Sequence, residues 1–103
     1  MDAGVARVWE FHVAPPAEAE FRRHYGPGGS WARLFRRSPG YIETLLLHDT
    51  AVPEKYVTVD LWESAPAFEA FRERFADEYA ALDARCEQLT TREVDLGSFV
   101  VMP

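Results

Sequence analysis

The order in which strand and helix signals follow one another limits the fold more than any other feature of this sequence. Four stretches rich in β-branched and aromatic residues are predicted to be strands. They are Val5–Val13, Tyr41–Asp49, Lys55–Trp62 and Thr91–Val101, the last interrupted by Gly97. Helical signals lie between the first two strands and between the last two. The resulting order, β-α-β-β-α-β, predicts an α+β fold of the ferredoxin-like type, with a four-stranded antiparallel sheet and the helices on one face.

The helical signals differ in length. Ala17–Tyr25 and Trp31–Arg37 are predicted as two pieces, because Gly26-Pro27-Gly28-Gly29 separates them and Ser30 is a good N-cap. After Ser64, a second predicted N-cap, apolar side chains recur at spacings of three and four. They are Phe68, Phe71, Phe75, Tyr79, Leu82, Cys86 and Leu89. This stripe predicts one helix of about seven turns.

Length and charge limit the possible partners. The chain has 103 residues, so we expect a single domain over residues 1–103. The formal net charge of −6 argues against nucleic acid as a partner, since phosphate binding needs clustered Lys and Arg. No apolar run approaches the roughly 18 residues of a membrane span, and the N-terminal residues do not form a leader pattern. We therefore expect a cytoplasmic protein that binds neither membrane nor nucleic acid.

No residues are spaced as a metal or cofactor site. The histidines His12, His24 and His48 follow no metal-ligand spacing, and Cys86, the single cysteine, is expected to be a buried thiol. The Gly-Pro-Gly-Gly segment is too short for a phosphate-binding motif and follows a helix rather than a strand. The sequence therefore predicts no metal and no bound cofactor.

The alternation along the first and third strands predicts two different sheet faces. One carries Trp9, Phe11, Val13, Val57, Val59 and Leu61, and pressing two such apolar faces together across a two-fold axis would form a barrel-like homodimer. The other carries Val8, Glu10, His12, Tyr56, Thr58, Asp60 and Trp62. We expect this second set to face the helices and to line a polar cavity that binds a ligand. Alternatively, Glu10, His12 and Asp60 are structural residues paired with Arg7, Arg72 or helix ends.

Two segments resemble a known family. The run Tyr56-Val-Thr-Val-Asp-Leu-Trp62-Glu-Ser64, followed by Ala67-Phe68, is similar to the antibiotic biosynthesis monooxygenase domain. So is the stretch Phe21…Tyr25-Gly-Pro-Gly-Gly…Trp31…Leu34-Phe35…Ser38-Pro39-Gly40-Tyr41. The resemblance implies a dimeric α+β barrel with a cavity in each subunit. Characterised members oxidise polycyclic phenols to quinones with O₂ and without metal, flavin or haem, while the superfamily also holds haem-degrading enzymes, isomerases and members without known activity.

The resemblance also implies roles for particular residues. Trp62 matches a tryptophan that ends the third strand in quinone-forming and haem-degrading members. Glu10 falls where those enzymes have an asparagine, and Arg72 falls where haem-degrading members have a proximal histidine. Haem degradation is therefore not expected.

The sequence thus predicts a cofactor-independent monooxygenase that uses O₂ to oxidise a small phenolic or polyketide-like aromatic molecule. The predicted catalytic residues are Glu10, His12, Asp60 and Trp62, with Glu10 or His12 as the general base. The predicted substrate-binding residues are Tyr25, Trp31, Tyr56, Thr58, Phe71, Arg72 and Phe75. Two alternatives remain open: a cyclase, isomerase or lyase that transfers protons in the same cavity, and a non-catalytic protein that binds an aromatic or haem-like ligand.

Overall fold

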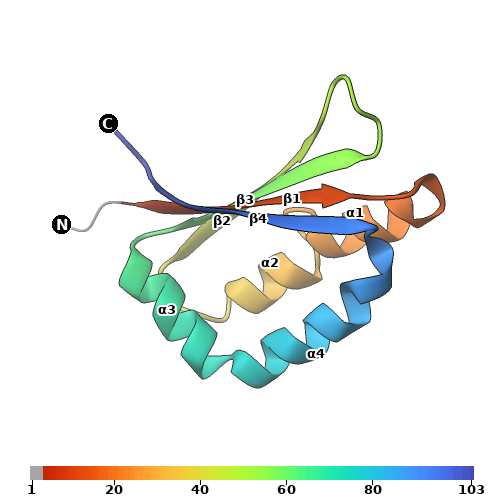
Figure 1. Cartoon of the computed structure of the whole chain (residues 1–103). Helices are drawn as coiled ribbons and strands as arrows, with labels where there is room; N and C mark the ends of the chain where they lie inside the picture. The colour runs from red at the N-terminus through yellow and green to blue at the C-terminus, as the bar shows by residue number, and fades with distance from the viewer. Residues whose placement is uncertain (1–3) are drawn as a thin grey trace.

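The computed structural model describes residues 4–103, which form a four-stranded antiparallel sheet with the helices on one of its faces (Figure 1). The strands are β1 (Val5–His12), β2 (Tyr41–His48), β3 (Lys55–Trp62) and β4 (Arg92–Val100). The helices are α1 (Glu18–Tyr25), α2 (Ser30–Phe35), α3 (Ala65–Arg74) and α4 (Ala76–Cys86), with 3-10 turns at Pro15–Ala17 and Glu87–Leu89. The strand order β2-β3-β1-β4 confirms the predicted ferredoxin-like topology.

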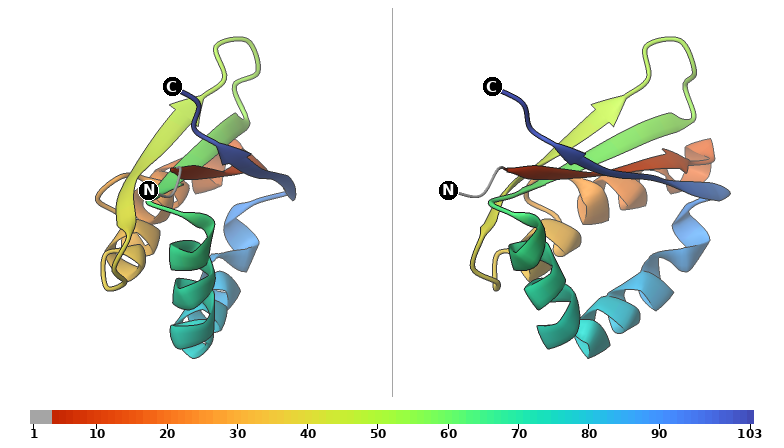
Figure 2. Two further views of the ribbon diagram at one scale, coloured as in Figure 1. Left: turned by 90° about the vertical axis from the view of Figure 1, so that its left-hand side faces the viewer. Right: turned by 60° about the vertical axis from the view of Figure 1, so that its left-hand side comes forward.

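The predicted long helix is wrong in one respect, because it is two helices. Phe75 leaves helical geometry, with φ −110° and ψ 27°, and α3 and α4 meet there at an angle (Figure 2). The bend keeps both halves of the apolar stripe against the core, since Phe71 on α3 and Leu82 on α4 are both buried. Ser64 is the N-cap of α3 as predicted, because its Oγ accepts a 3.2 Å hydrogen bond from Ala67 N–H.

The N-cap predicted at Ser30 is also wrong. Gly29 occupies that position, and Ser30 is the first residue of α2. The Ser30 hydroxyl instead lies 2.8 Å from Nδ1 of His24, so it connects α2 to α1.

The core lies between the sheet and the helices. Its largest fully buried side chains are Trp62, Tyr56, Phe21, Phe71, Val13 and Cys86. Burial of Cys86 agrees with the prediction of a buried thiol, and this burial raises the pKa of the thiol. Large aromatic rings account for most of this core, which suits a short chain that must bury much apolar surface.

The register between β1 and β3 decides which side chains meet. Trp9 lies opposite Thr58 and Arg7 opposite Asp60, while Glu10 lies opposite Val57. Directly opposed residues of an antiparallel pair point to the same face of the sheet. Arg7, Trp9 and Phe11 therefore face the helices together with the even-numbered residues of β3.

Two sequence-based expectations are consequently wrong. Glu10 and His12 were expected to share a face with Asp60 and Trp62, but they point to the opposite, uncovered face of the sheet, together with Val57 and Lys55. Trp9 and Phe11 were expected on that uncovered face, but they face the helices. Alternation defines two rows of side chains within each strand, but it does not say which row of one strand lies beside which row of the next.

The uncovered face is largely apolar. Exposed apolar side chains on it include Leu45 and Leu47 of β2 and Phe99 of β4. At one end, His12 Nε2 lies 2.7 Å from Glu10 Oε2, and Lys55 Nζ lies 3.6 Å from Glu10 Oε1. The predicted interruption at Gly97 is confirmed, because the β1–β4 register shifts there and Gly97 has φ 105°.

Candidate functional site

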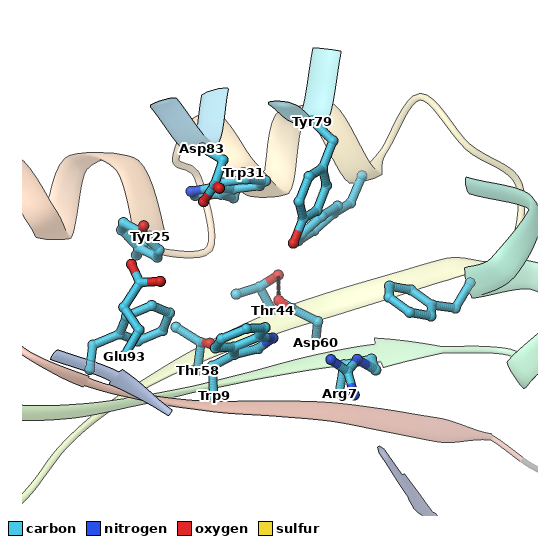
Figure 3. A pocket seen from close by; sticks show the side chains of 13 residues that line it. Arg7, Trp9, Tyr25, Trp31, Thr44, Thr58, Asp60, Tyr79, Asp83 and Glu93 are labelled. Atoms are coloured by element: carbon cyan, nitrogen blue, oxygen red, sulfur yellow. Dashed lines mark hydrogen bonds between the residues drawn. The ribbon is translucent and has the colours of Figure 1, made fainter. Parts of the chain in front are cut away.

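A cavity lies between the sheet and the helices, and all four strands contribute side chains to it (Figure 3). Its 13 lining residues are Arg7, Trp9, Phe11, Tyr25, Trp31, Phe35, Thr44, Thr58, Asp60, Phe68, Tyr79, Asp83 and Glu93. Tyr25 and Trp31 are buried whereas Asp83 and Glu93 are exposed, so the cavity runs from the core to the surface. Its volume is about 60 Å³. Pockets for small molecules commonly measure about 300–1,000 Å³, so a fused-ring ligand would have to displace side chains at the opening.

Asp60 is the buried ionisable group of this cavity. Asp60 is only 9% exposed, and Thr44 Oγ1 donates a 2.7 Å hydrogen bond to its Oδ1. Burial raises the pKa of Asp60 to about 6, while the Thr44 hydrogen bond and the positive charge of Arg7 oppose this shift. Asp60 can therefore exchange a proton near neutral pH, as a general base must.

A second hydroxyl extends this hydrogen-bonded chain. Tyr41 Oη lies 2.7 Å from Thr44 Oγ1. Because the Thr44 proton is used in the bond to Asp60, Tyr41 must be the donor to Thr44. The three side chains come from β2 and β3, where Thr44 and Asp60 are directly opposed.

Arg7 provides a fixed positive charge beside Asp60. Its Nη1 donates to Ser98 Oγ at 3.0 Å, and its Nη2 donates to Asp95 Oδ2 at 3.1 Å. The guanidinium group also lies 5.3 Å from the centre of the Phe68 ring. Arg7 Nε is buried without a hydrogen-bond partner among residues 4–103, so this donor remains available to a ligand that reaches it.

Aromatic rings form most of the remaining cavity wall. The ring centres of Trp9 and Phe11 are 6.2 Å apart, and those of Phe11 and Tyr25 are 4.8 Å apart. Trp31 lies 6.1 Å from Tyr25 and 4.9 Å from Tyr79 by the same measure. Burial raises the pKa values of Tyr25 and Tyr79, so both phenols stay neutral at physiological pH. The wall therefore suits a flat aromatic ligand.

Only part of the predicted site lies at this cavity. Asp60, Thr58, Tyr25 and Trp31 line it. Four others are buried in the surrounding core and do not line it, namely Tyr56, Trp62, Phe71 and Phe75. Arg72 is exposed, with its guanidinium 4.8 Å from the centre of the Tyr79 ring. The prediction that Glu10, His12, Asp60 and Trp62 line one cavity is wrong, because Glu10 and His12 lie on the other face of the sheet and Trp62 is packed in the core.

Several lining residues were missed by the sequence analysis. Arg7, Trp9 and Phe11 alternate along β1 and would have been found if the opposite row of that strand had been assigned to the cavity. Asp83 lies on α4 and Glu93 on β4, and no local pattern in either segment shows that both side chains reach the same opening.

Two further properties of the described residues concern metal ions and membranes. Within residues 4–103, no group of three or more His, Cys, Asp or Glu side chains is arranged to hold a metal ion. In the same part of the chain, no helix is long and apolar enough to cross a membrane.

The fold and the cavity define the class: ferredoxin-like α+β domains with a cavity between the sheet and its helices. Within that class, residues 4–85 match the model of the family described as antibiotic biosynthesis monooxygenase, and the chain belongs to this family. No curated protein matches the sequence.

Solved structures agree with this assignment. SnoaB, a cofactor-independent oxygenase from Streptomyces nogalater, is 27% identical, with a TM-score of 0.62 over 98% of this chain and 95% of that chain. Rv0793 from Mycobacterium tuberculosis is 20% identical, with a TM-score of 0.69 over 98% and 95% of the two chains. A protein from Bordetella bronchiseptica reaches a TM-score of 0.78 at 18% identity, over 99% of this chain and 100% of that one. The last two comparisons support the fold alone.

Proposed function

We propose that this protein is a cofactor-independent monooxygenase that oxidises a small phenolic aromatic molecule in the cavity between its sheet and helices. The observation that supports this most directly is Asp60, a buried carboxyl group whose pKa is about 6, on the wall of an aromatic cavity. Family membership and the similarity to a cofactor-independent oxygenase support the same reaction class.

In this proposal Asp60 replaces Glu10 and His12 as the general base. Its carboxylate accepts the phenolic proton, and the rings of Trp9, Trp31 and Tyr79 hold the substrate and exclude water. Arg7 stabilises the negative charge that develops beside Asp60. Deprotonation gives the substrate carbanion character, so the substrate itself can supply electrons to O₂.

The overall reaction balances without an external reductant. A ring carbon of the phenolate forms a bond to O₂, and the resulting peroxide takes up a proton. Loss of the hydrogen on that carbon then accompanies cleavage of the O–O bond. One oxygen atom becomes the new quinone carbonyl, and the other leaves as water with two hydrogens that came from the substrate. The substrate is thereby oxidised, and O₂ is fully reduced.

We further propose that a second copy of the chain covers the open face of the sheet. Leu45, Leu47 and Phe99 there are 41%, 48% and 52% exposed. An apolar face of this extent is a common site of association, and a symmetric contact would bury it on both copies. The proposed homodimer keeps the cavity intact, because the cavity lies on the other side of the sheet.

Oxygen uptake tests the reaction. Wild-type protein is incubated with a panel of hydroxylated naphthalenes and anthrones in an oxygen electrode, and Asp60→Asn is compared with it. We expect at least one substrate to be consumed with one O₂ taken up per quinone formed, and Asp60→Asn to be slower by about 10²–10⁴. Substrate conversion without oxygen uptake would replace this proposal with a proton-transfer cyclase, isomerase or lyase. Binding without conversion of any panel member would favour a non-catalytic binding protein.

A further inference from the structure

Charge is distributed unevenly along the cavity. In Figure 3, Arg7 and Asp60 lie toward one end, whereas Asp83 of α4 and Glu93 of β4 lie toward the other, with Tyr25 and Trp31. We call this second group, Asp83, Glu93, Tyr25 and Trp31, the acidic end of the cavity. The positive charge of Arg7 is already matched by Asp95 at 3.1 Å. The charged lining residues of the acidic end, Asp83 and Glu93, are both carboxylates.

The two carboxylates of the acidic end are not neutralised by the protein. Within residues 4–103, neither Asp83 nor Glu93 forms an ion pair with a Lys, Arg or His side chain. The Glu93 carboxylate accepts a 3.1 Å hydrogen bond from the neutral hydroxyl of Thr90. Other acidic side chains also lack an ion pair, but apart from Asp60 those side chains do not line the cavity. Asp83 and Glu93 thus retain their capacity to bind a cation.

Aromatic faces accompany these carboxylates. Trp31 lies 6.1 Å from Tyr25 and 4.9 Å from Tyr79, so three electron-rich rings are grouped on the cavity wall. Burial is the main cause of the raised pKa of Tyr25, and Cys86 and the negative charge of Glu93 add to it. Burial also raises the pKa of Tyr79, where Arg72 opposes the shift and the negative charge of Asp83 adds to it. Each carboxylate is therefore close enough to influence one of the rings. The Arg72 guanidinium lies 4.8 Å from the centre of the Tyr79 ring, whereas no Arg or Lys side chain of residues 4–103 forms a cation–π contact with Tyr25 or Trp31.

We propose that the acidic end of the cavity binds an alkylammonium group, so that the substrate is an aromatic molecule with a protonated aliphatic amine. Aromatic faces attract cations through their quadrupoles, and this attraction is strongest where water is excluded. The ammonium N–H groups would donate charge-assisted hydrogen bonds to Asp83 and Glu93. The same two carboxylates would repel an anionic substituent and so discriminate against acidic aromatic molecules. This inference rests on the proposed function for the reacting end of the substrate, but amine binding itself needs no turnover.

Three probes of one shape and different charge test the proposal. They are 1-naphthylmethylamine, which is cationic at pH 7, 1-naphthalenemethanol, which is neutral, and 1-naphthoic acid, which is anionic. Their affinities for wild-type protein are measured by isothermal titration calorimetry at low ionic strength. We expect the amine to bind at least about fivefold more tightly than the alcohol, the effect of one partly exposed ion pair and one cation–π contact. The acid should bind most weakly, and the preference for the amine should decrease as salt is added.

Two double variants that remove the same charge test whether the preference for the amine comes from Asp83 and Glu93. Asp83→Asn combined with Glu93→Gln should reduce the amine-to-alcohol ratio to about one, since both carboxylates are removed. Glu69→Gln combined with Asp77→Asn removes the same charge from exposed residues of α3 and α4 that do not line the cavity, and should leave the ratio unchanged. Equal affinity for amine and alcohol, an unchanged preference in the first variant, or no binding of any probe would overturn the proposal. A clear amine preference in a protein that consumes no oxygen would refute the proposed function and leave the amine site standing.

Discussion

The Thr44 hydroxyl donates a 2.7 Å hydrogen bond to Oδ1 of Asp60, across directly opposed positions of β2 and β3. Because this bond uses the Thr44 proton, the hydroxyl of Tyr41 is the donor in its 2.7 Å contact with Thr44 Oγ1. No hydrogen bond among residues 4–103 reaches Oδ2 of Asp60. Thr44 therefore orients the carboxyl group and leaves its second oxygen available for a proton from a ligand.

Replacing Thr44 should shift the pH dependence of the reaction. The Thr44 hydrogen bond lowers the pKa of Asp60, so Thr44→Val should raise it further. We expect the acidic limb of the pH profile of kcat/KM to move to higher pH by about 0.4–1 unit. This shift in pKa corresponds to the net free energy of one hydrogen bond. Thr44→Ser keeps the hydroxyl and serves as the control. An identical limb in Thr44→Val and wild type would show that this hydrogen bond does not tune the base.

Asp60 should also make the folded protein less stable as the pH rises. Its folded pKa of about 6 lies above its ordinary value of 3.8, so between these pH values the folded state holds a proton that the unfolded state has lost. The contribution of Asp60 to stability is therefore greatest at low pH and decreases as the pH rises through about 6. The total change is about 3 kcal/mol by the standard conversion of pKa shifts.

The Asp60→Asn variant isolates this contribution. Asparagine keeps an oxygen that can accept the Thr44 hydrogen bond, but it does not titrate. Urea denaturation at pH 4 and pH 7 should show that the variant gains stability relative to wild type as the pH rises. A constant difference between the two proteins over this range would mean that Asp60 titrates normally.

The structure explains which parts of the site could be predicted from the sequence. Element positions followed from local patterns, such as the alternation in Lys55–Trp62 and the Ser64 N-cap, because these signals lie within each segment. The break at Phe75 could not be predicted, since Phe75 fits the apolar stripe equally well on a straight or a bent helix. Asp60 was recognised because the apolar row of β3 was assigned to a dimer contact, which leaves the row of Asp60 to face the helices. The role of Arg7 and Trp9 depended on the register between β1 and β3, and no local pattern determines that register.

Glu10 and His12 provide a direct test of this register. They lie on the open face of the sheet, where His12 Nε2 is 2.7 Å from Glu10 Oε2. We therefore expect Glu10→Gln and His12→Ala to keep turnover within about threefold of wild type, far from the 10²–10⁴ loss caused by removing a general base. Steady-state kinetics on a substrate found in the oxygen-uptake panel measures this. A hundredfold loss in either variant would place these side chains in the reaction.

Trp62 should matter for stability rather than for substrate orientation. It is fully buried, its ring packs at 5.3–5.7 Å from Phe35, Tyr41, Phe68 and Phe71, and it does not line the cavity. Trp62→Phe leaves a void and should lower the free energy of unfolding by about 1–3 kcal/mol. Because Trp62 Nε1 has no hydrogen-bond partner within residues 4–103, the loss of the indole N–H adds no further cost. Urea denaturation monitored by far-UV circular dichroism measures the change, and a large loss of kcat in a variant of wild-type stability would contradict this assignment.

The proposed homodimer predicts which surface substitutions produce monomers. Val59 lies between Val8 of β1 and Leu45 of β2 on the open face of the sheet. Leu45→Lys and Val59→Lys each place one charge per subunit in the proposed contact, where burying an unpaired charge costs several kcal/mol. We expect wild type to be a dimer and both variants to be monomers in multi-angle light scattering at micromolar concentration.

Two comparisons make this test specific. Ala80→Lys adds the same charge at an exposed position of α4, away from the open face, and should remain dimeric. Leu45 is already 41% exposed in the isolated chain, so Leu45→Lys should leave the monomer folded, with an unchanged far-UV circular dichroism spectrum. Wild type that elutes as a monomer, or a Leu45→Lys variant that dimerises as strongly as wild type, would show that a second copy does not cover this face.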